Sequence, residues 1–244
     1  MPARLTVLGS INMDLVVYAD RLPASGETLL ATDFQTFPGG KGANQAVAAA
    51  RMGAQVQMLG KVGEDAFGEQ LLANLRANGV ATENVGRIKK PSGTALITVD
   101  RRGRNTIMVV PGANGVVRPG DLDGWQAALT QTQVLLMQLE IPLETVLAAA
   151  RRARSSGERV MLNPSPVQPL TDELLSLVDV LVLNETEIGL ISGEDVSTPE
   201  KLERAGRKLL ELGVGWVVVT LGGEGVLAVD REGTLRAPAF EVEV

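Results

Sequence analysis

The 244-residue sequence contains neither cysteine nor histidine. The lack of cysteine excludes disulfides, thiolate nucleophiles and the usual cysteine-based zinc sites, and the lack of histidine excludes imidazole acid–base chemistry. Chemistry in this chain would therefore depend on carboxylates, lysines, backbone dipoles and a hard metal ion. Phosphoryl transfer needs little beyond positioning and charge neutralisation, so it is our first hypothesis for the reaction class.

The sequence also lacks long apolar runs and an excess of positive charge. No apolar run approaches the roughly 18 residues needed to span a bilayer, and residues 1–4 lead into a strand without a signal-peptide core, so we expect a cytoplasmic protein without a membrane partner. The net charge is −6, from 29 acidic and 23 basic residues, which argues against nucleic acid as a partner. A small-molecule substrate fits this composition better.

The remaining composition predicts one large globular domain over residues 1–244. The chain is 45% hydrophobic, and its strands and helices alternate along most of its length. This alternation predicts an α/β fold with a mostly parallel sheet and helices on both faces.

Two β-rich regions, at about 14–36 and 92–110, interrupt the alternation and read as hairpins. They predict a small separate β-sheet that acts as a lid and excludes water from a site. Extra edge strands on the main sheet are the alternative.

Residues 38–46 (PGGKGANQA) join a glycine-rich loop to the start of a helix. Glycines let backbone N–H groups approach a ligand closely, and a helix N-terminus adds partial positive charge. We expect Asn44 to lie on the same side as Gly40 and Lys41. The stretch is not a Walker A loop, because Gly42 stands where Ser or Thr would hold magnesium. An ordinary loop-to-helix turn is the alternative interpretation.

Asn12 and Asp14 follow a short apolar strand expected at residues 5–8. We expect them in the loop beyond its carboxyl end, where open parallel sheets bind ligands. An amide and a carboxylate two residues apart could there hydrogen-bond vicinal hydroxyls. An Asx-turn is the alternative.

Later strands also end in polar residues or glycines. The strands expected at 134–139, 160–162, 180–183 and 216–220 end at Glu140, Asn163, Asn184 and the turn 221–225. This repeated placement predicts one composite site, although helix capping is an equal explanation for single residues such as Asn163.

Asn184 and Glu187 lie three apart at an expected helix start. Glu187 could hold magnesium directly or through water, and a capping box is an alternative that can coexist with that role. The glycine-rich turn 221–225 is followed by a strand, so it is not a Rossmann fingerprint.

Three motifs in this order carry a family resemblance: residues 9–14 (GSINMD), 39–44 (GGKGAN) and 184–187 (NETE). Together they resemble the ribokinase branch of the PfkB family of carbohydrate kinases, and the likeness spans the whole chain. It implies transfer of the ATP γ-phosphoryl group to a pentose, ribose at O5, with Mg²⁺ and K⁺. It also implies a homodimer through the lid, for which an exposed apolar lid face would be the matching observation.

The resemblance also implies roles for individual residues. The sugar would be held by Asn12, Asp14, Gly40, Lys41, Gly42, Ala43, Asn44 and Glu140, with Ala95 and Ile97 as lid contacts above it. ATP would be held by Asn184, Thr220, Leu221, Gly222, Gly223, Glu224 and Gly225. Glu187 would organise the magnesium ion.

Kinases of this family close with a Gly-Ala-Gly-Asp motif that supplies an anion hole and the catalytic base, and the motif is absent from these residues. We therefore assign no catalytic residue within 1–244 and expect the base in a segment beyond Val244. Another sugar or nucleoside kinase of the family and a catalytically silent sugar-binding relative stay open. A dinucleotide oxidoreductase is disfavoured, because the first strand is not followed by Gly-x-Gly-x-x-Gly.

Overall fold

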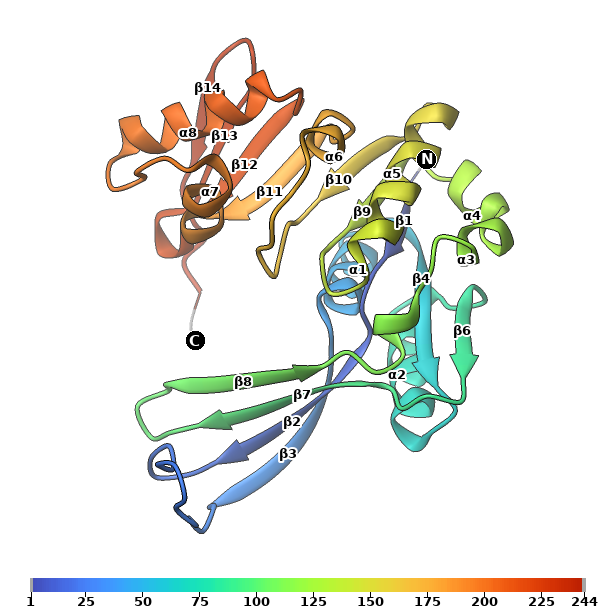
Figure 1. The fold of residues 1–244 in the computed structure, drawn as a ribbon, viewed down its shortest axis with the longest axis vertical. Coiled ribbons are helices and arrows are strands. Elements are labelled where there is room, and N and C mark those ends of the chain that lie inside the picture. The colour runs from blue at the N-terminus through green and yellow to red at the C-terminus, as the bar shows by residue number, and fades with distance from the viewer. Residues whose placement is uncertain (1, 243–244) are drawn as a thin grey trace. The chain divides into compact units, whose positions relative to one another are not determined.

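The computed structural model describes residues 2–242 (Figure 1). Its internal contacts divide the chain into two compact units, which we describe separately. Unit 1 contains the residues up to 128 together with 140–142, and unit 2 contains residues 129–139 and those from 143 onward. The prediction of a single domain over the whole chain stays a prediction.

Unit 1 contains the first part of the main sheet. β1 (Arg4–Leu8) pairs in parallel with β4 (Gln55–Gly63), which also pairs in parallel with β5 (Val80–Ala81) and β6 (Val85–Ile88). Two helices accompany these strands, α1 (Lys41–Arg51) and α2 (Ala66–Ala77). The Asp65 side chain caps α2 by accepting a hydrogen bond from the Gly68 N–H group.

A small sheet of four strands also belongs to unit 1, in the order β3-β2-β7-β8 (Figure 1). Its strands are β2 (Asn12–Tyr18), β3 (Asp33–Gly39), β7 (Gly93–Val99) and β8 (Asn105–Val110). β2 and β3 form one antiparallel hairpin, β7 and β8 form another, and the parallel pairing of β2 with β7 joins them. The second sheet that the two β-rich regions predict is therefore present.

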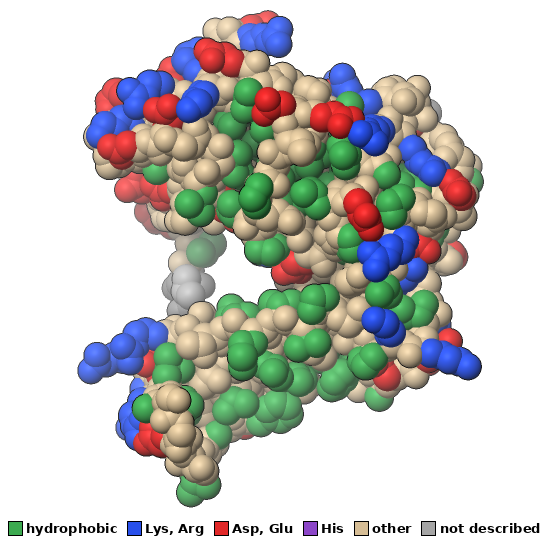
Figure 2. Space-filling model, viewed as in Figure 1, with side chains coloured by type: hydrophobic (Ala, Val, Ile, Leu, Met, Phe, Trp, Pro, Cys, Tyr) green, Lys and Arg blue, Asp and Glu red, His purple; other side chains and the backbone are tan. Residues whose placement is uncertain are grey.

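The strand register assigns the residues of the small sheet to its two faces. The register places Asn12 and Asp14 on one face with Ala95 and Ile97, because alternate residues of a strand share a face. The other face carries the exposed apolar side chains Phe34, Leu96, Met108 and Val110, and exposed apolar side chains such as Ile107 lie on the first face as well. Hydrophobic side chains are visible along these strands in Figure 2.

The chain between the small sheet and unit 2 contains short helical segments. They are η1 (Asn114–Val116), α3 (Asp121–Gly124) and α4 (Gln126–Thr130).

Unit 2 contains parallel strands in the order β12-β11-β10-β9. They are β9 (Val134–Met137), β10 (Arg159–Leu162), β11 (Val180–Asn184) and β12 (Trp216–Thr220). The antiparallel strands β13 (Val226–Val229) and β14 (Thr234–Ala237) extend the sheet beyond β12. A mostly parallel sheet with helices between its strands confirms the predicted α/β class.

The helices of unit 2 are α5 (Leu143–Ser156), α6 (Asp172–Ser176), α7 (Glu185–Ser192) and α8 (Pro199–Glu211). The core contains alternate residues of the strands, such as Val160, Leu181 and Val217, each of which is fully buried. The opposite face of the strands is also apolar, but Trp216 and Leu235 on it are exposed. Among residues 2–242, no helix combines the length and the apolar character that crossing a membrane requires.

Candidate functional site

The glycine-rich stretch packs against the segment that follows β1. Helix α1 begins at Lys41, and the Ala43 N–H group donates to the Ser10 carbonyl oxygen at 2.9 Å. Gly40 has a φ of 90°, and a Cβ atom there would lie 2.7 Å from the Asn12 backbone nitrogen. A Cβ at Gly42 would lie 2.7 Å from the Ser10 nitrogen. These glycines are therefore required by the close approach of two backbones, whatever ligand binds beside them.

Glu140 is held at the N-terminus of α1. Its carboxylate accepts hydrogen bonds from the Ser10 hydroxyl and, at 3.1 Å, from the Lys41 N–H group. The Ser10 hydroxyl oxygen also accepts from the Gly42 N–H group at 3.3 Å. The partial positive charge of a helix N-terminus stabilises a carboxylate in this position. The arrangement fixes Glu140 beside the glycine-rich stretch, as the predicted sugar site requires.

Asp14 lies near enough to Glu140 for their charges to interact. It stands on β2 and not in a loop, so the expected loop position and the Asx-turn alternative are both wrong. A Cβ atom at Gly39 would lie 2.3 Å from an Asp14 carboxylate oxygen, so Gly39 makes the space that this carboxylate occupies. Burial raises the pKa of Asp14, and the negative charge of Glu140 raises it further. Two carboxylates are thus brought close enough to interact.

Asn12 is a buried member of the predicted sugar residues, with 3% of its surface exposed. Its Oδ1 atom accepts a hydrogen bond from Asn114 Nδ2 at 2.7 Å. Its own Nδ2 atom has no hydrogen-bond partner among residues 2–242 and is not fully enclosed. Asn12 therefore keeps a free donor on the face of β2 that also carries Asp14.

The other predicted sugar residues differ in their burial and in their contacts. Ala95 is buried and pairs with Asp14 in the register of β2 and β7, whereas Ile97 pairs with Val16 further along. The Lys41 ammonium group makes no ion pair or hydrogen bond within residues 2–242. Asn44 is exposed and lines a hollow of about 300 Å³ with residues of α1 and α2, including Arg51.

Ser10 and Asn114 are the two residues that our reading of the sequence missed. Ser10 is fully buried and Asn114 is 1% exposed, yet both are polar and both contact a predicted sugar residue. Their partners lie 130 and 102 positions away, so no local spacing marks them. The available signal was the placement of Ser10 between Gly9 and Asn12, inside a motif already noted.

In unit 2, the predicted nucleotide residues gather at the carboxyl ends of neighbouring strands. Asn184 ends β11 and pairs in register with Thr220, which ends β12. The Thr220 hydroxyl donates to the Leu183 carbonyl oxygen at 3.3 Å. Asn163, at the end of β10, donates to the Val182 carbonyl oxygen at 3.0 Å, which supports a structural role for that residue.

The turn after β12 exposes its glycines. Residues 221–225 close through a hydrogen bond from the Leu221 N–H group to the Gly225 carbonyl oxygen at 2.8 Å. Gly225 has a φ of 96°, and a Cβ there would lie 2.0 Å from the Ala237 carbonyl oxygen, so the fold itself requires this glycine. Cβ atoms at Gly222 and Gly223 would meet nothing within 4 Å, which leaves this backbone open to a ligand.

Glu187 completes the capping box that the spacing predicts. The Asn184 side chain accepts from the Glu187 N–H group at 2.8 Å, and Glu187 Oε2 accepts from the Asn184 N–H group at 3.0 Å. Within the described part of the chain, no three acidic side chains form a set that could hold a metal ion. A single carboxylate fits Mg²⁺ only where nucleotide phosphates and water supply the other ligands, which is the usual arrangement for this ion.

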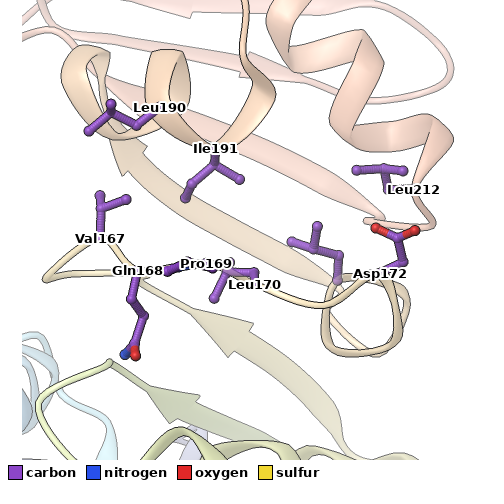
Figure 3. Close-up of a pocket in the computed structure, with 9 residues that line it drawn as sticks. Val167, Gln168, Pro169, Leu170, Asp172, Leu190, Ile191 and Leu212 are labelled. Atoms are coloured by element: carbon purple, nitrogen blue, oxygen red, sulfur yellow. The ribbon is translucent and has the colours of Figure 1, made fainter.

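A further hollow of about 560 Å³ in unit 2 is lined by none of the predicted site residues. Figure 3 shows it between the loop that carries Val167 and Pro169 and the end of α7, with Leu190 and Ile191. Its lining is mainly apolar, in contrast to the polar strand ends.

Comparison with known proteins gives consistent matches. The family model described as pfkB family carbohydrate kinase matches residues 2–244. The chain is 41% identical to the ribokinase of Bacillus subtilis over 240 residues, covering 98% of this chain and 78% of that protein. It is 38% identical to the deoxyribokinase of Salmonella typhimurium, with the same coverage. The structure of Arabidopsis thaliana ribokinase complexed with ribose and ATP matches with a TM-score of 0.89 and 32% identity, covering 98% of this chain and 78% of that one.

Proposed function

Because the chain belongs to the pfkB family of carbohydrate kinases, we propose that it binds D-ribose and that the γ-phosphoryl group of ATP is transferred to the ribose O5. The observation that carries the proposal is the polar cluster of unit 1. Asn12 offers a donor, while Asp14 and Glu140 offer acceptors, beside the N-terminus of α1. Hydroxyl groups both donate and accept, so a polyol matches this set.

The residues of the cluster have separate roles in this proposal. Asp14 accepts hydrogen bonds from sugar hydroxyls, and Asn12 donates to one of them. Glu140 is already fixed by the Ser10 hydroxyl and by the Lys41 N–H group, so it presents its remaining acceptor capacity without reorganisation. Lys41, whose ammonium group has no partner within residues 2–242, is available to a hydroxyl or phosphate oxygen.

ATP would be held by unit 2 at Asn184, Thr220 and the turn 221–225. The open backbone at Gly222 and Gly223 supports this part of the proposal. Magnesium would be held mainly by the nucleotide phosphates, with Glu187 acting through water, because one of its oxygens is committed to the capping box. Bound magnesium would neutralise charge that develops during the transfer. Activation by K⁺ stays a prediction of the family resemblance.

The catalytic base is not assigned to any residue of 1–244. Asp14 and Glu140 are both proposed to hold sugar hydroxyls, and the expectation that an aspartate beyond Val244 takes the proton stays a prediction. Ribose phosphorylation by residues 1–244 alone would contradict that expectation, and would require a residue that we assign to binding to act as the base.

Deoxyribose is the second candidate, favoured by the 38% identity to a deoxyribokinase. A sugar panel of D-ribose, 2-deoxyribose, fructose and adenosine separates the candidates. Calorimetric titration gives the affinity for each sugar, and mass spectrometry after incubation with ATP and magnesium detects any phosphorylated product. We expect ribose to bind most tightly. Tighter binding of adenosine or fructose would indicate another kinase of the family, and binding without transfer by the natural protein would indicate a silent relative.

We also propose that two copies of the chain associate through the small sheet. The support is its apolar face, where Phe34 is 57% exposed, Met108 is 66% exposed and Val110 is 50% exposed. An exposed apolar face of this kind is typical of an interaction surface. Sedimentation equilibrium measures the resulting mass directly.

A further inference from the structure

We propose that Asn114 is a positioning residue for sugar binding: its hydrogen bond to Asn12 holds the Asn12 amide with Nδ2 directed at the sugar. This inference rests on the proposed function, because it assigns to Asn12 the role of donor to a hydroxyl. It adds a residue from another part of the chain to the site.

Two hydrogen bonds to the Ile11 backbone orient the Asn114 amide. The Ile11 N–H group donates to Asn114 Oδ1 at 3.0 Å, and Asn114 Nδ2 donates to the Ile11 carbonyl oxygen at 3.2 Å. A backbone N–H group can only donate and a carbonyl oxygen can only accept. These two bonds therefore fix which end of the Asn114 amide is oxygen and which is nitrogen.

The orientation of Asn114 then fixes that of Asn12. Asn114 Nδ2 can only donate, and it lies 2.7 Å from the Asn12 side-chain oxygen. If the Asn12 amide rotated by half a turn, two NH₂ groups would face each other and a hydrogen bond would be lost inside a buried site. Asn12 must therefore present its NH₂ group away from Asn114.

Gly93 shows that the fold reserves space for this contact. A Cβ atom at Gly93 would lie 2.2 Å from both Asn114 Nδ2 and Asn12 Oδ1. Gly93 is not in a left-handed conformation, so the backbone alone does not require glycine there. The absence of a side chain is explained by the hydrogen bond between the two asparagines.

The result is a fixed pattern of one donor and one acceptor along β2. Asn12 Nδ2 donates, and Asp14, two residues further on the same face, accepts. Neighbouring hydroxyls of a sugar match the pattern, since one can accept from Asn12 while another donates to Asp14. With the Asn12 amide reversed, two acceptors would compete for hydroxyl hydrogens, and affinity would fall.

The test is a double-mutant cycle on ribose affinity, measured by calorimetry with Asn12→Ala, Asn114→Asp and the double variant at pH 8. Aspartate has the shape of asparagine but, when ionised, cannot donate to Asn12. We expect each single variant to weaken ribose binding by about tenfold, the effect of one lost hydrogen bond in a buried site. Because Asn114 acts through Asn12, we expect the double variant to be no weaker than Asn12→Ala.

Controls separate positioning from loss of structure. Asn105→Asp makes the same chemical change at an exposed position of β8 and should leave ribose affinity unchanged. Binding of an ATP analogue should be unchanged in all variants. If Asn114→Asp does not fold, Asn114→Ala replaces it in the cycle, since it removes the same donor without adding a charge.

Two results would overturn the inference while leaving the proposed function intact. One is an unchanged ribose affinity in both Asn114 variants. The other is an additive cycle, in which the double variant binds ribose about a hundredfold more weakly than the unmodified protein; this would mean that Asn114 acts independently of Asn12. If the unmodified protein binds no ribose, the proposed function fails, and this inference fails with it.

Discussion

Replacing Asp14 by asparagine should weaken ribose binding without destabilising the fold. Asp14→Asn keeps the shape of the side chain but replaces a charged acceptor on β2 by an amide. A hydrogen bond to a charged group is worth about 1.5–3 kcal/mol, which corresponds to a loss of about 10- to 150-fold in ribose affinity. The ATP affinity should not change, because the predicted nucleotide residues belong to unit 2.

The same substitution should not destabilise the fold. Burial and the charge of Glu140 raise the pKa of Asp14, so the folded protein binds a proton at this carboxyl more readily than the unfolded chain does. The stability contributed by Asp14 therefore falls as the pH rises through the interval between the ordinary and the raised pKa. Above that interval the ionised Asp14 carboxylate lowers the free energy of unfolding, and an uncharged asparagine does not. At pH 7 we expect Asp14→Asn to be at least as stable as the unmodified protein.

Calorimetry with ribose and thermal unfolding at pH 7 test both statements. Asp20→Asn is a matched control, because Asp20 is an exposed carboxylate paired with Arg101 at 2.7 Å, and surface pairs contribute little. For the unmodified protein, ribose affinity should fall as the pH decreases through the raised pKa of Asp14. Ribose affinity within twofold of the unmodified protein in Asp14→Asn would refute the assignment of Asp14, and marked destabilisation would refute the stability argument.

Two further predictions concern magnesium and association. Glu187→Gln keeps an acceptor for the capping box but removes the negative charge. We therefore expect nucleotide binding to require more magnesium, while ribose affinity stays unchanged. An unchanged magnesium titration would mean that Glu187 serves only as part of the helix cap. Met108→Glu places a charge on the apolar face of the small sheet and should shift the protein toward monomer in sedimentation equilibrium, whereas the exposed Glu232→Gln should not. An unchanged mass for Met108→Glu would contradict association through this face.

The elements of the fold could be predicted from the sequence because their signals are local. The Thr198-Pro199 start of α8, the Asp65 cap of α2 and the turn between β7 and β8 each depend on residues within a few positions of one another. The position of Asn12 and Asp14 was predicted wrongly. Only three residues separate β1 from β2, so the start of β2 looks like a loop when the sequence is read locally. It is a strand because it pairs with β3 on one side and with β7 on the other.

The site could be predicted only in part, because its supporting contacts are distant in sequence. The role of Gly40 and Gly42 in backbone packing depends on residues 10–12, about 30 positions earlier, so the motif alone indicated only close approach to a ligand. Ser10 contacts Glu140 across 130 positions. A single sequence carries no signal for such a pair.

The most direct test of our account is a crystal structure of the protein with D-ribose. We predict that the sugar lies in unit 1, with hydroxyl oxygens within hydrogen-bonding distance of Asn12 Nδ2 and of the Asp14 and Glu140 carboxylates. Ribose bound at another site, with these three side chains free of sugar, would contradict the central claim.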